Sequence, residues 1–274
     1  MTPNKRLGQH FLTDRNILDR IVDALDPAPG DVVLEIGPGK GSLTEALLAR
    51  GLTVIAVEKD RRLAAELREQ GAGSSEQLRI VEGDALRLDW HELVNPPAPT
   101  APSSPLPAPS KIVGNIPYNI TSPLLEKALT PPLPERVVFL VQKEVADRLA
   151  AGPGSRVYGA LSVGVQAQCH VERLLTVPAG AFMPRPKVTS ALVRLTPLPD
   201  SAITSGEVPA FRAFVTACFA RRRKQLRNVL MGVTGQSAAV VTAGLRDLGL
   251  DAAARPETLG PPAFARLLRW SARL

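Results

Sequence analysis

The chain has 274 residues, 45% of them hydrophobic and 22% charged, so it can bury the core of one large domain or two smaller ones. Lys and Arg total 33 against 26 Asp and Glu, a formal net charge of +7, which is compatible with a nucleic-acid partner. The two cysteines lie outside any CxxC pair, no apolar run reaches the length of a membrane span, and the first residues lack the apolar stretch of a signal peptide, so we expect a cytoplasmic protein with neither a metal site nor a membrane segment.

Up to residue 150, short apolar runs alternate with helical patterns. The apolar runs predict strands at 31–36, 53–58, 78–84, 111–115 and 136–142. The helical patterns predict helices at 42–50, 60–70, 122–129 and 143–150, the first of them with a capping box formed by Ser42 and Glu45. Two further strands, 171–177 and 188–195, have no helix between them. The pattern predicts an α/β fold with a mostly parallel sheet, covered on both faces, and an antiparallel strand at its edge.

Two regions depart from this alternation. The segment 95–110 is dominated by Pro, Ala and Ser, and an exposed loop inserted without a function is favoured there over a peptide ligand for a partner. From residue 199 on, the pattern is helical, and 210–230 is expected to form one long helix with an apolar face. We therefore predict an α/β domain at 1–198 and a small helical domain at 199–274.

A glycine-rich turn, from Glu35 to Gly41, follows the first expected strand. Glycine lets the backbone approach a ligand that a side chain would block, so Gly37, Gly39 and Gly41 are candidate ligand-binding positions. The spacing is not that of a dinucleotide fingerprint, and there is no GK[ST] phosphate loop. The pattern E-x-G-x-G-x-G resembles the first motif of class I methyltransferases, which bind S-adenosylmethionine. A tight turn without a ligand is the alternative.

Carboxylates stand at the ends of the next two expected strands. Glu58 ends one of them, where an acid accepts hydrogen bonds from ribose hydroxyls. Asp84, followed by Ala85, ends the other, where an acid in class I methyltransferases meets the adenine amino group of the cofactor. A single carboxylate at a strand end is more often a cap or a solvated charge. Ligands bind at the carboxyl edge of open parallel sheets, however, so the two acids and the glycine turn together predict a cofactor site there.

The most specific signal is Asn115-Ile116-Pro117-Tyr118, at the end of the fourth expected strand. It resembles the N/D-P-P-Y/F motif of methyltransferases that act on exocyclic amines of bases. An adenine N6 amine is a poor nucleophile because its lone pair is delocalised into the ring. If the Asn115 side-chain oxygen and the Ile116 carbonyl accept its two N–H groups, the nitrogen can pyramidalise toward the sulfonium methyl, while Tyr118 stacks on the base. A loop that turns at Pro117, capped by Asn115, is the alternative.

Three segments are candidates for contacts with RNA. In 182–190, Phe182 is either the second face of an adenine sandwich or a core residue, and Arg185 and Lys187 can meet phosphates. The segment KRLGQHFL near the N-terminus contributes Lys5 and Arg6, and we assign its histidine no acid or base role. The basic run near residue 224 is either a phosphate-contacting face or a solvated run of charge. Its candidate residues are Arg221, Arg222, Arg223, Lys224 and Arg227.

Almost end to end, the chain resembles the small-subunit ribosomal RNA adenine dimethyltransferase family. The motifs that carry the resemblance are KRLGQHFL, EIGPGKG, the Glu58 acid, GDAL, NIPYNITSPLL, FMPRPKVTSAL and FARRRKQLRN. It implies a Rossmann-like class I methyltransferase sheet and cofactor contacts from His10, Leu12, Gly37, Glu58, Asp84 and Asn115. His10 stands where many members carry Asn, and 95–110 is not a family feature.

The resemblance implies four methyl transfers from S-adenosyl-L-methionine, giving N6,N6-dimethyladenosine at two adjacent adenosines in a hairpin near the 3′ end of small-subunit rRNA. The implied substrate is an assembling 30S subunit, and a monomer is the default expectation. Three alternatives stay open: a large-subunit rRNA adenine methyltransferase of the resistance type, a non-catalytic ribosome assembly factor, and a DNA adenine methyltransferase. The N-terminal motif and the basic run favour the small subunit over the large one.

Overall fold

The computed structural model describes residues 9–71, 76–94 and 111–274. Its contacts divide the chain into two compact units, of which the first comprises Met1–Ala146 with Glu172–Thr196 and the second Asp147–Val171 with Pro197–Leu274. The second unit therefore takes in residues 147–171, which the sequence pattern grouped with the α/β domain. Lys5, Arg6 and the segment 95–110 lie outside the described residues.

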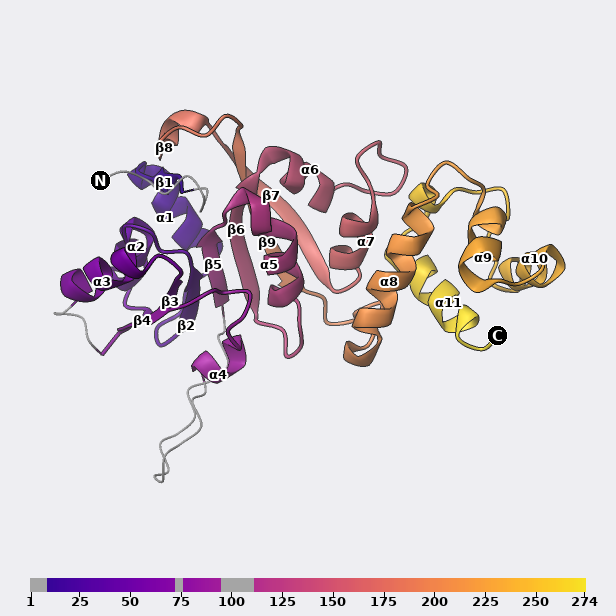
Figure 1. Cartoon of the computed structure of the whole chain (residues 1–274), viewed down its shortest axis with the longest axis horizontal. Coiled ribbons are helices and arrows are strands. Elements are labelled where there is room, and N and C mark those ends of the chain that lie inside the picture. The colour runs from indigo at the N-terminus through magenta and orange to yellow at the C-terminus, as the bar shows by residue number, and fades with distance from the viewer. Residues whose placement is uncertain (1–8, 72–75, 95–110) are drawn as a thin grey trace, which may run out of the picture. The chain divides into compact units, whose positions relative to one another are not determined.

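The first unit is built on a seven-stranded sheet with the strand order β4-β3-β2-β5-β6-β9-β7 (Figure 1). Its strands are β2 (Val32–Ile36), β3 (Thr53–Glu58), β4 (Leu78–Glu82), β5 (Lys111–Asn115), β6 (Arg136–Gln142), β7 (Cys169–Val177) and β9 (Ser190–Pro197). The strands from β4 to β6 pair in parallel, and β9 pairs antiparallel with β6. The predicted α/β fold is confirmed; β9 lies one position inside the edge that β7 forms.

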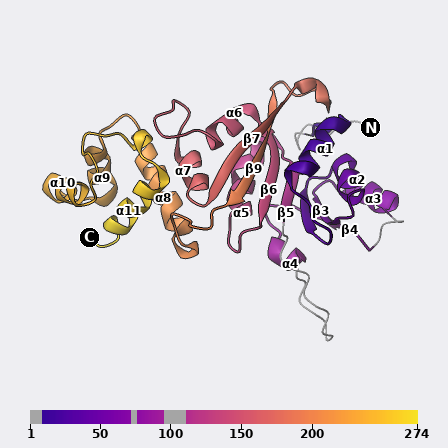
Figure 2. The ribbon, with the colours of Figure 1, turned by 180° about the vertical axis from the view of Figure 1, so that it is seen from behind.

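Helices cover both faces of this sheet (Figures 1 and 2). They are α1 (Arg15–Ala24), α2 (Ser42–Leu48), α3 (Arg61–Gln70), α4 (Trp90–Val94), α5 (Thr121–Ala128) and α6 (Lys143–Leu149). Helix α3 begins after Asp60, whose carboxylate accepts backbone N–H groups of its first turn, as a cap residue does. The capping box predicted for α2 is wrong, because the left-handed Gly41 is the residue before the helix and no side chain caps it.

A short antiparallel pair, β1 (Phe11–Leu12) with β8 (Phe182–Met183), joins segments far apart in the sequence. Two residues are too few to show the alternation by which strands are predicted, so the sequence did not reveal this pair. Leu12 and Phe182 face each other in its register and are buried in the same core cluster as α1 and the central strands. The pairing holds the N-terminal segment of the described chain beside the carboxyl end of the sheet.

The second unit consists of helices around a core that includes Tyr158, Phe211 and Phe264. Its helices are α7 (Ala160–Gln166), α8 (Val208–Phe219), α9 (Leu226–Thr234), α10 (Ala238–Asp247) and α11 (Pro261–Ser271). The single helix predicted over 210–230 is wrong, since residues 220–225 separate α8 from α9. Leu226 begins α9, fully buried, and its N–H bonds the carbonyl of Ala254. Most of the basic run, residues 221–224, lies in the turn between the two helices, and Arg227 lies in the first turn of α9.

Within the described residues, no helix is both long and apolar enough to cross a membrane. The same residues contain no group of three or more His, Cys, Asp and Glu side chains that could hold a metal ion.

Candidate functional site

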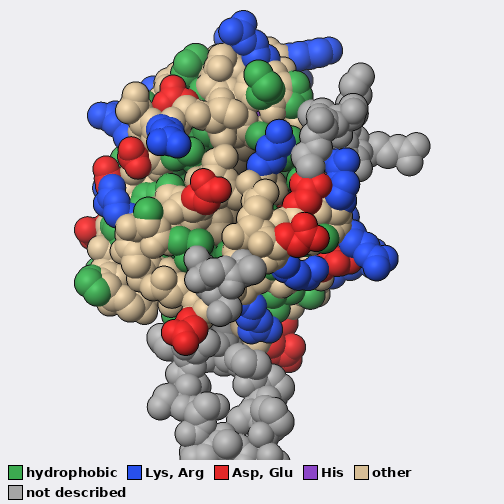
Figure 3. Space-filling view, turned by 90° about the vertical axis from the view of Figure 1, so that its left-hand side faces the viewer, with side chains coloured by type: hydrophobic (Ala, Val, Ile, Leu, Met, Phe, Trp, Pro, Cys, Tyr) green, Lys and Arg blue, Asp and Glu red, His purple; other side chains and the backbone are tan. Residues whose placement is uncertain are grey.

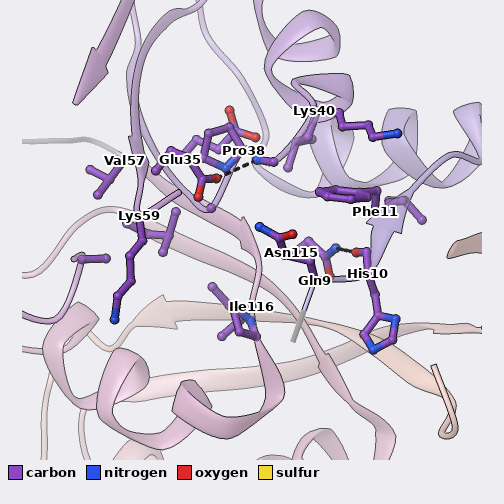
Figure 4. Close-up of a pocket in the computed structure, with 18 of the residues that line it drawn as sticks. Gln9, His10, Phe11, Glu35, Pro38, Lys40, Val57, Lys59, Asn115 and Ile116 are labelled. Atoms are coloured by element: carbon purple, nitrogen blue, oxygen red, sulfur yellow. Dashed lines mark hydrogen bonds between the residues drawn. The ribbon is translucent and has the colours of Figure 1, made fainter. Parts of the chain in front are cut away.

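A cavity of about 190 Å³ opens at the carboxyl ends of β2, β3, β4 and β5 (Figure 4). Parallel strands end at one edge of a sheet, and ligands bind in that crevice. The lining includes most of the candidate residues that the sequence identified, which are His10, Leu12, Gly37, Gly39, Glu58, Asp84, Ala85, Asn115, Ile116, Pro117 and Tyr118. Gly41 and Phe182 do not belong to it.

The glycine turn after β2 closes one side of the cavity. Gly37 and Gly39 have φ angles of +70° and +62°, a conformation that glycine adopts without strain. A Cβ atom on Gly39 would come within 2.9 Å of the Phe11 ring, whereas one on Gly41 would come within 2.6 Å of Leu67. Gly39 is therefore needed for close packing at the cavity wall, and Gly41 for close packing against Leu67 of α3.

Glu58 links the end of β3 to this turn. One carboxylate oxygen accepts the N–H of Gly39 at 3.0 Å and the other accepts the N–H of Asp60 at 2.8 Å. The side chain is 5% exposed, and burial raises the pKa of Glu58 above its ordinary value against the effect of these hydrogen bonds. A carboxylate oxygen accepts more than one hydrogen bond, so Glu58 both holds the turn and keeps acceptor capacity toward the cavity.

Asp84 lies at the rim of the cavity beyond β4. Lys59 donates to one of its oxygens at 2.8 Å, and the N–H of Leu86 donates to the other at 3.0 Å. The hydrogen bond from Lys59 is the main reason why the pKa of Asp84 lies below its ordinary value. Asp84 is thus an ionised, anchored acceptor, and Ala85 beside it is buried.

Asn115, at the end of β5, is oriented by a residue from the N-terminal segment of the described chain. Its side-chain N–H donates to the carbonyl of His10 at 2.7 Å. Next to the β1–β8 pair, the N–H of Thr13 donates to the carbonyl of Ala181 and so points toward the partner strand. Backbone groups of successive residues point to alternate sides of a strand. The carbonyl of His10, three residues earlier, therefore points away from β8. Because the amide nitrogen is engaged, the amide oxygen of Asn115 is the group left to accept a hydrogen bond in the cavity.

Tyr118 is held at its hydroxyl, which shares a 2.7 Å hydrogen bond with the buried Ser190. Burial raises the pKa of Tyr118, which keeps the hydroxyl protonated. Its ring lies 5.9 Å from the His10 ring, centroid to centroid, with 25° between the planes. The ring is half-buried and lines the cavity, so it provides a fixed aromatic surface beside Asn115.

Phe182 is a core residue. It is 2% exposed, whereas Met183 next to it is 70% exposed, because successive side chains of a strand point to opposite faces. The second face of an adenine sandwich, one of the two interpretations of Phe182, does not fit this placement. The other interpretation, a core residue, does.

Glu35 also lines the cavity, although its place in the sequence predicts no role for its side chain. It is 1% exposed and accepts a 2.7 Å hydrogen bond from the Thr44 hydroxyl. Burial raises the pKa of Glu35 to about 8; the Thr44 hydrogen bond opposes this shift, and the charge of Glu58 adds to it. The signal was a carboxylate inside the otherwise apolar strand VVLEI.

We expect Glu35 to make stability depend on pH. The unfolded chain loses this proton above pH 4.5, whereas the folded chain keeps it up to about pH 8. The free energy of unfolding should therefore fall as pH rises through this window, with a slope of at most about 1.4 kcal/mol per pH unit from this group. Glu35→Gln keeps an acceptor for Thr44 and should remove this contribution to the pH dependence of the free energy of unfolding. Urea unfolding at pH 5 and pH 8 measures the change. Glu45→Gln, at an exposed position, is the control, and an unchanged slope in Glu35→Gln would show that Glu35 is ionised when folded.

The basic candidates divide into exposed and engaged side chains. Arg185 and Lys187 are exposed in the first unit, and Arg221, Arg223, Lys224 and Arg227 in the second. Arg222 pairs with Glu257 and donates to the carbonyls of Ser155 and Arg156. Arg222 therefore fastens two turns of the second unit and is not free to meet a phosphate.

On one face of the first unit, charge alone does not mark a binding surface. Figure 3 shows Lys and Arg side chains interspersed with Asp and Glu on this face. Within the unit, basic residues also pair with acids, as Arg62 does with Glu66. The cavity therefore identifies the site, and no patch of one sign stands out on the face shown.

Comparison with known proteins gives consistent matches. A family model described as "Ribosomal RNA adenine dimethylase" matches residues 1–249. The protein named ribosomal RNA small subunit methyltransferase A from Hahella chejuensis is 42% identical over 264 residues, covering 96% of this chain and 90% of that protein. The protein of the same name from Aeromonas hydrophila is 40% identical, covering 99% and 94%.

Two solved structures resemble the fold of this chain over nearly its whole length. A dimethyladenosine transferase from Plasmodium falciparum is 28% identical with a TM-score of 0.81, covering 96% of this chain and 98% of that one. The 23S rRNA methyltransferase ErmE is also 28% identical, with a TM-score of 0.69 and coverage of 96% and 99%.

Proposed function

The chain belongs to the ribosomal RNA adenine dimethylase family, and we propose that it transfers methyl groups from S-adenosylmethionine to the N6 amine of adenosines in small-subunit ribosomal RNA. The observation that carries this proposal is the orientation of Asn115 at the end of β5, with its amide oxygen left as an acceptor beside Tyr118. The relatives of 40% and 42% identity are named for the small subunit, which favours it over the large subunit named in the ErmE structure.

The cavity fits S-adenosylmethionine, which when bound supplies an electrophilic methyl group on a sulfonium. The Glu58 carboxylate is placed to accept hydrogen bonds from the ribose hydroxyls, as acids at this strand end do. Asp84 and Ala85 are placed to meet the adenine ring of the cofactor, and the glycine turn lets the backbone approach the cofactor. His10 and Leu12 complete this wall from the N-terminal side.

The residues after β5 activate the amine. The Asn115 oxygen and the Ile116 carbonyl accept its two N–H groups, which localises the nitrogen lone pair and directs it at the methyl carbon. Tyr118 stacks on the adenine and holds it in the plane that this requires. Forming the N–C bond would break the bond between the methyl group and the sulfonium sulfur, which would leave as a neutral thioether. The methylated nitrogen would then be cationic and acidic enough to pass a proton to water, so no residue need act as a base first.

The finer points rest on the family resemblance. We propose four transfers in all, producing N6,N6-dimethyladenosine at two adjacent adenosines of a hairpin near the 3′ end of the RNA. The substrate is an assembling 30S subunit, and the protein acts in the cytoplasm as a monomer. Arg185 and Lys187 contact RNA phosphates beside the site, as Lys5 and Arg6 do from the N-terminal segment outside the described residues.

The exposed residues of the basic run should contribute to RNA affinity through phosphates. Replacing Arg221, Arg223 and Lys224 with Ala should weaken binding and reduce the slope of log K against log salt by about one per lost contact. Binding of small subunits at several salt concentrations measures both quantities. The control is the replacement of three other exposed residues, Arg20, Arg61 and Arg246, with Ala, which changes the net charge by the same amount. Equal slopes for the two triple variants would show that the basic run is solvated and does not contact phosphates.

A methyl-transfer assay tests the proposed substrate class. The protein is incubated with labelled S-adenosylmethionine and, in parallel, unmethylated small subunits, large subunits or DNA. We expect label in the small subunit alone. Label in the large subunit would indicate a resistance-type enzyme, and no label in any substrate would indicate a non-catalytic assembly factor.

A further inference from the structure

His10 contacts three parts of the site at once. Its carbonyl accepts the Asn115 amide, its ring nitrogen Nδ1 lies 2.8 Å from the carbonyl of Pro184, and its ring stacks against Tyr118. In Figure 4 the imidazole points away from Glu35 and Pro38. The backbone of His10 therefore holds Asn115, and its side chain contacts Tyr118 beside it.

We propose that the His10 imidazole is a positioning residue for the target adenine, holding the Tyr118 ring as the surface on which that base stacks. The inference rests on the proposed function, because it assigns a role in the same reaction. It concerns the side chain, whereas any contact of His10 with the cofactor through its backbone would persist in every variant at this position.

The hydrogen bond to Pro184 fixes the imidazole. A carbonyl is only an acceptor, so Nδ1 carries the proton, and the ring cannot rotate without losing this bond. Residues 10 and 184 continue the register of the β1–β8 pair, in which Phe11 faces Met183 and Leu12 faces Phe182. The imidazole is thus anchored to the residue that directly follows β8.

The fixed imidazole in turn restrains Tyr118. Ser190 holds the hydroxyl end of this side chain, and the His10 ring lies nearly parallel to the Tyr118 ring, with the two centroids 5.9 Å apart. Tyr118 lines the cavity together with Asn115, and we assign the cavity side of its ring to the base whose N6 amine must meet the Asn115 amide. Phe182, which is buried in the core, does not share this task. Without the imidazole, Tyr118 is restrained at its hydroxyl end but not across its ring.

Three substitutions separate the two interactions of the side chain. His10→Phe keeps a ring but loses the hydrogen bond, His10→Asn keeps a donor for Pro184 but loses the ring, and His10→Ala loses both. An aromatic pair contributes enough to change a rate by about three- to tenfold. We expect kcat on small subunits to fall by about that factor in His10→Ala and His10→Asn, to fall less in His10→Phe, which keeps the ring without its anchor, and to be unchanged in the exposed control His170→Asn.

Two further measurements distinguish this role from others. The Kd for S-adenosylmethionine, measured by calorimetry, should stay within about twofold of the wild-type value in all variants. Amide hydrogen exchange at 116–120 should be faster in His10→Ala than in wild type and intermediate in His10→Phe, independently of activity. Equal kcat and equal exchange in wild type and His10→Ala would overturn the inference, as would a loss of cofactor affinity that accounts for the whole change. A wild-type protein that methylates no subunit would contradict the proposed function instead.

Discussion

Asn115→Ala is expected to lower turnover by about 100-fold or more while leaving the Kd for S-adenosylmethionine close to its wild-type value. The amide oxygen accepts an N–H of the target amine in the transition state, and losing one preorganised hydrogen-bonding group of this kind costs roughly two or more orders of magnitude in rate. Single-turnover methylation of small subunits measures the rate, and calorimetry measures cofactor affinity. Asn16→Ala, on the exposed side of α1, is the matched control.

The same variant tests how the amide is held. The Asn115 amide binds the His10 carbonyl, so alanine leaves that carbonyl to water, and the fold should persist. A far-UV spectrum and an unfolding midpoint close to wild type show that the loss is chemical. Turnover equal to that of wild type would remove Asn115 from the reaction and leave the proposed mechanism without its acceptor.

Lys111→Met is expected to lower the free energy of unfolding by about 3–5 kcal/mol, the range for breaking a buried ion pair on one side. Lys111 begins β5 and is 4% exposed. Its ammonium group pairs with Asp31 and donates to the carbonyl of Asp26 at 2.7 Å. Methionine keeps most of the volume and leaves the Asp31 carboxylate without this cation. Urea unfolding measures the loss.

Two companion variants identify the cause of that loss. Arg20→Met changes an exposed charge and should alter the free energy of unfolding by less than about 0.5 kcal/mol. Adding Asp31→Asn to Lys111→Met removes the charge that has lost its ammonium partner and should recover part of the loss. A Lys111→Met protein as stable as wild type would mean that water solvates Asp31 in the folded state.

Patterns within single segments predicted most of the sheet. The strands β3 and β6 have the expected bounds, because continuous apolar runs of this length are typical of buried parallel strands. The site residues at the ends of β3 and β5 could be located for a related reason, since parallel strands bring their carboxyl ends to one edge. The acids and Asn115 therefore needed only the strand order to meet at one cavity.

What the sequence could not predict depends on contacts between distant segments. The hydrogen bond from Asn115 to the His10 carbonyl and the pairing of Leu12 with Phe182 join residues that no local pattern relates. The break between α8 and α9 also depends on a distant segment. The helical periodicity of 210–230 continues through residues 220–225, but the backbone turns there, and Arg222 in this turn pairs with Glu257. Local periodicity cannot show which partner a charged side chain finds.

The central claim is dimethylation of adenosine in the small subunit, and nucleoside mass spectrometry tests it most directly. Unmethylated small subunits are incubated with the wild-type protein and labelled S-adenosylmethionine, and the RNA is then digested to nucleosides. Asn115→Ala and a parallel reaction on large subunits serve as controls. We predict labelled N6,N6-dimethyladenosine in the small subunit treated with the wild-type protein, and none in the two controls. Label only in the large subunit, or label in another nucleoside, would contradict the account.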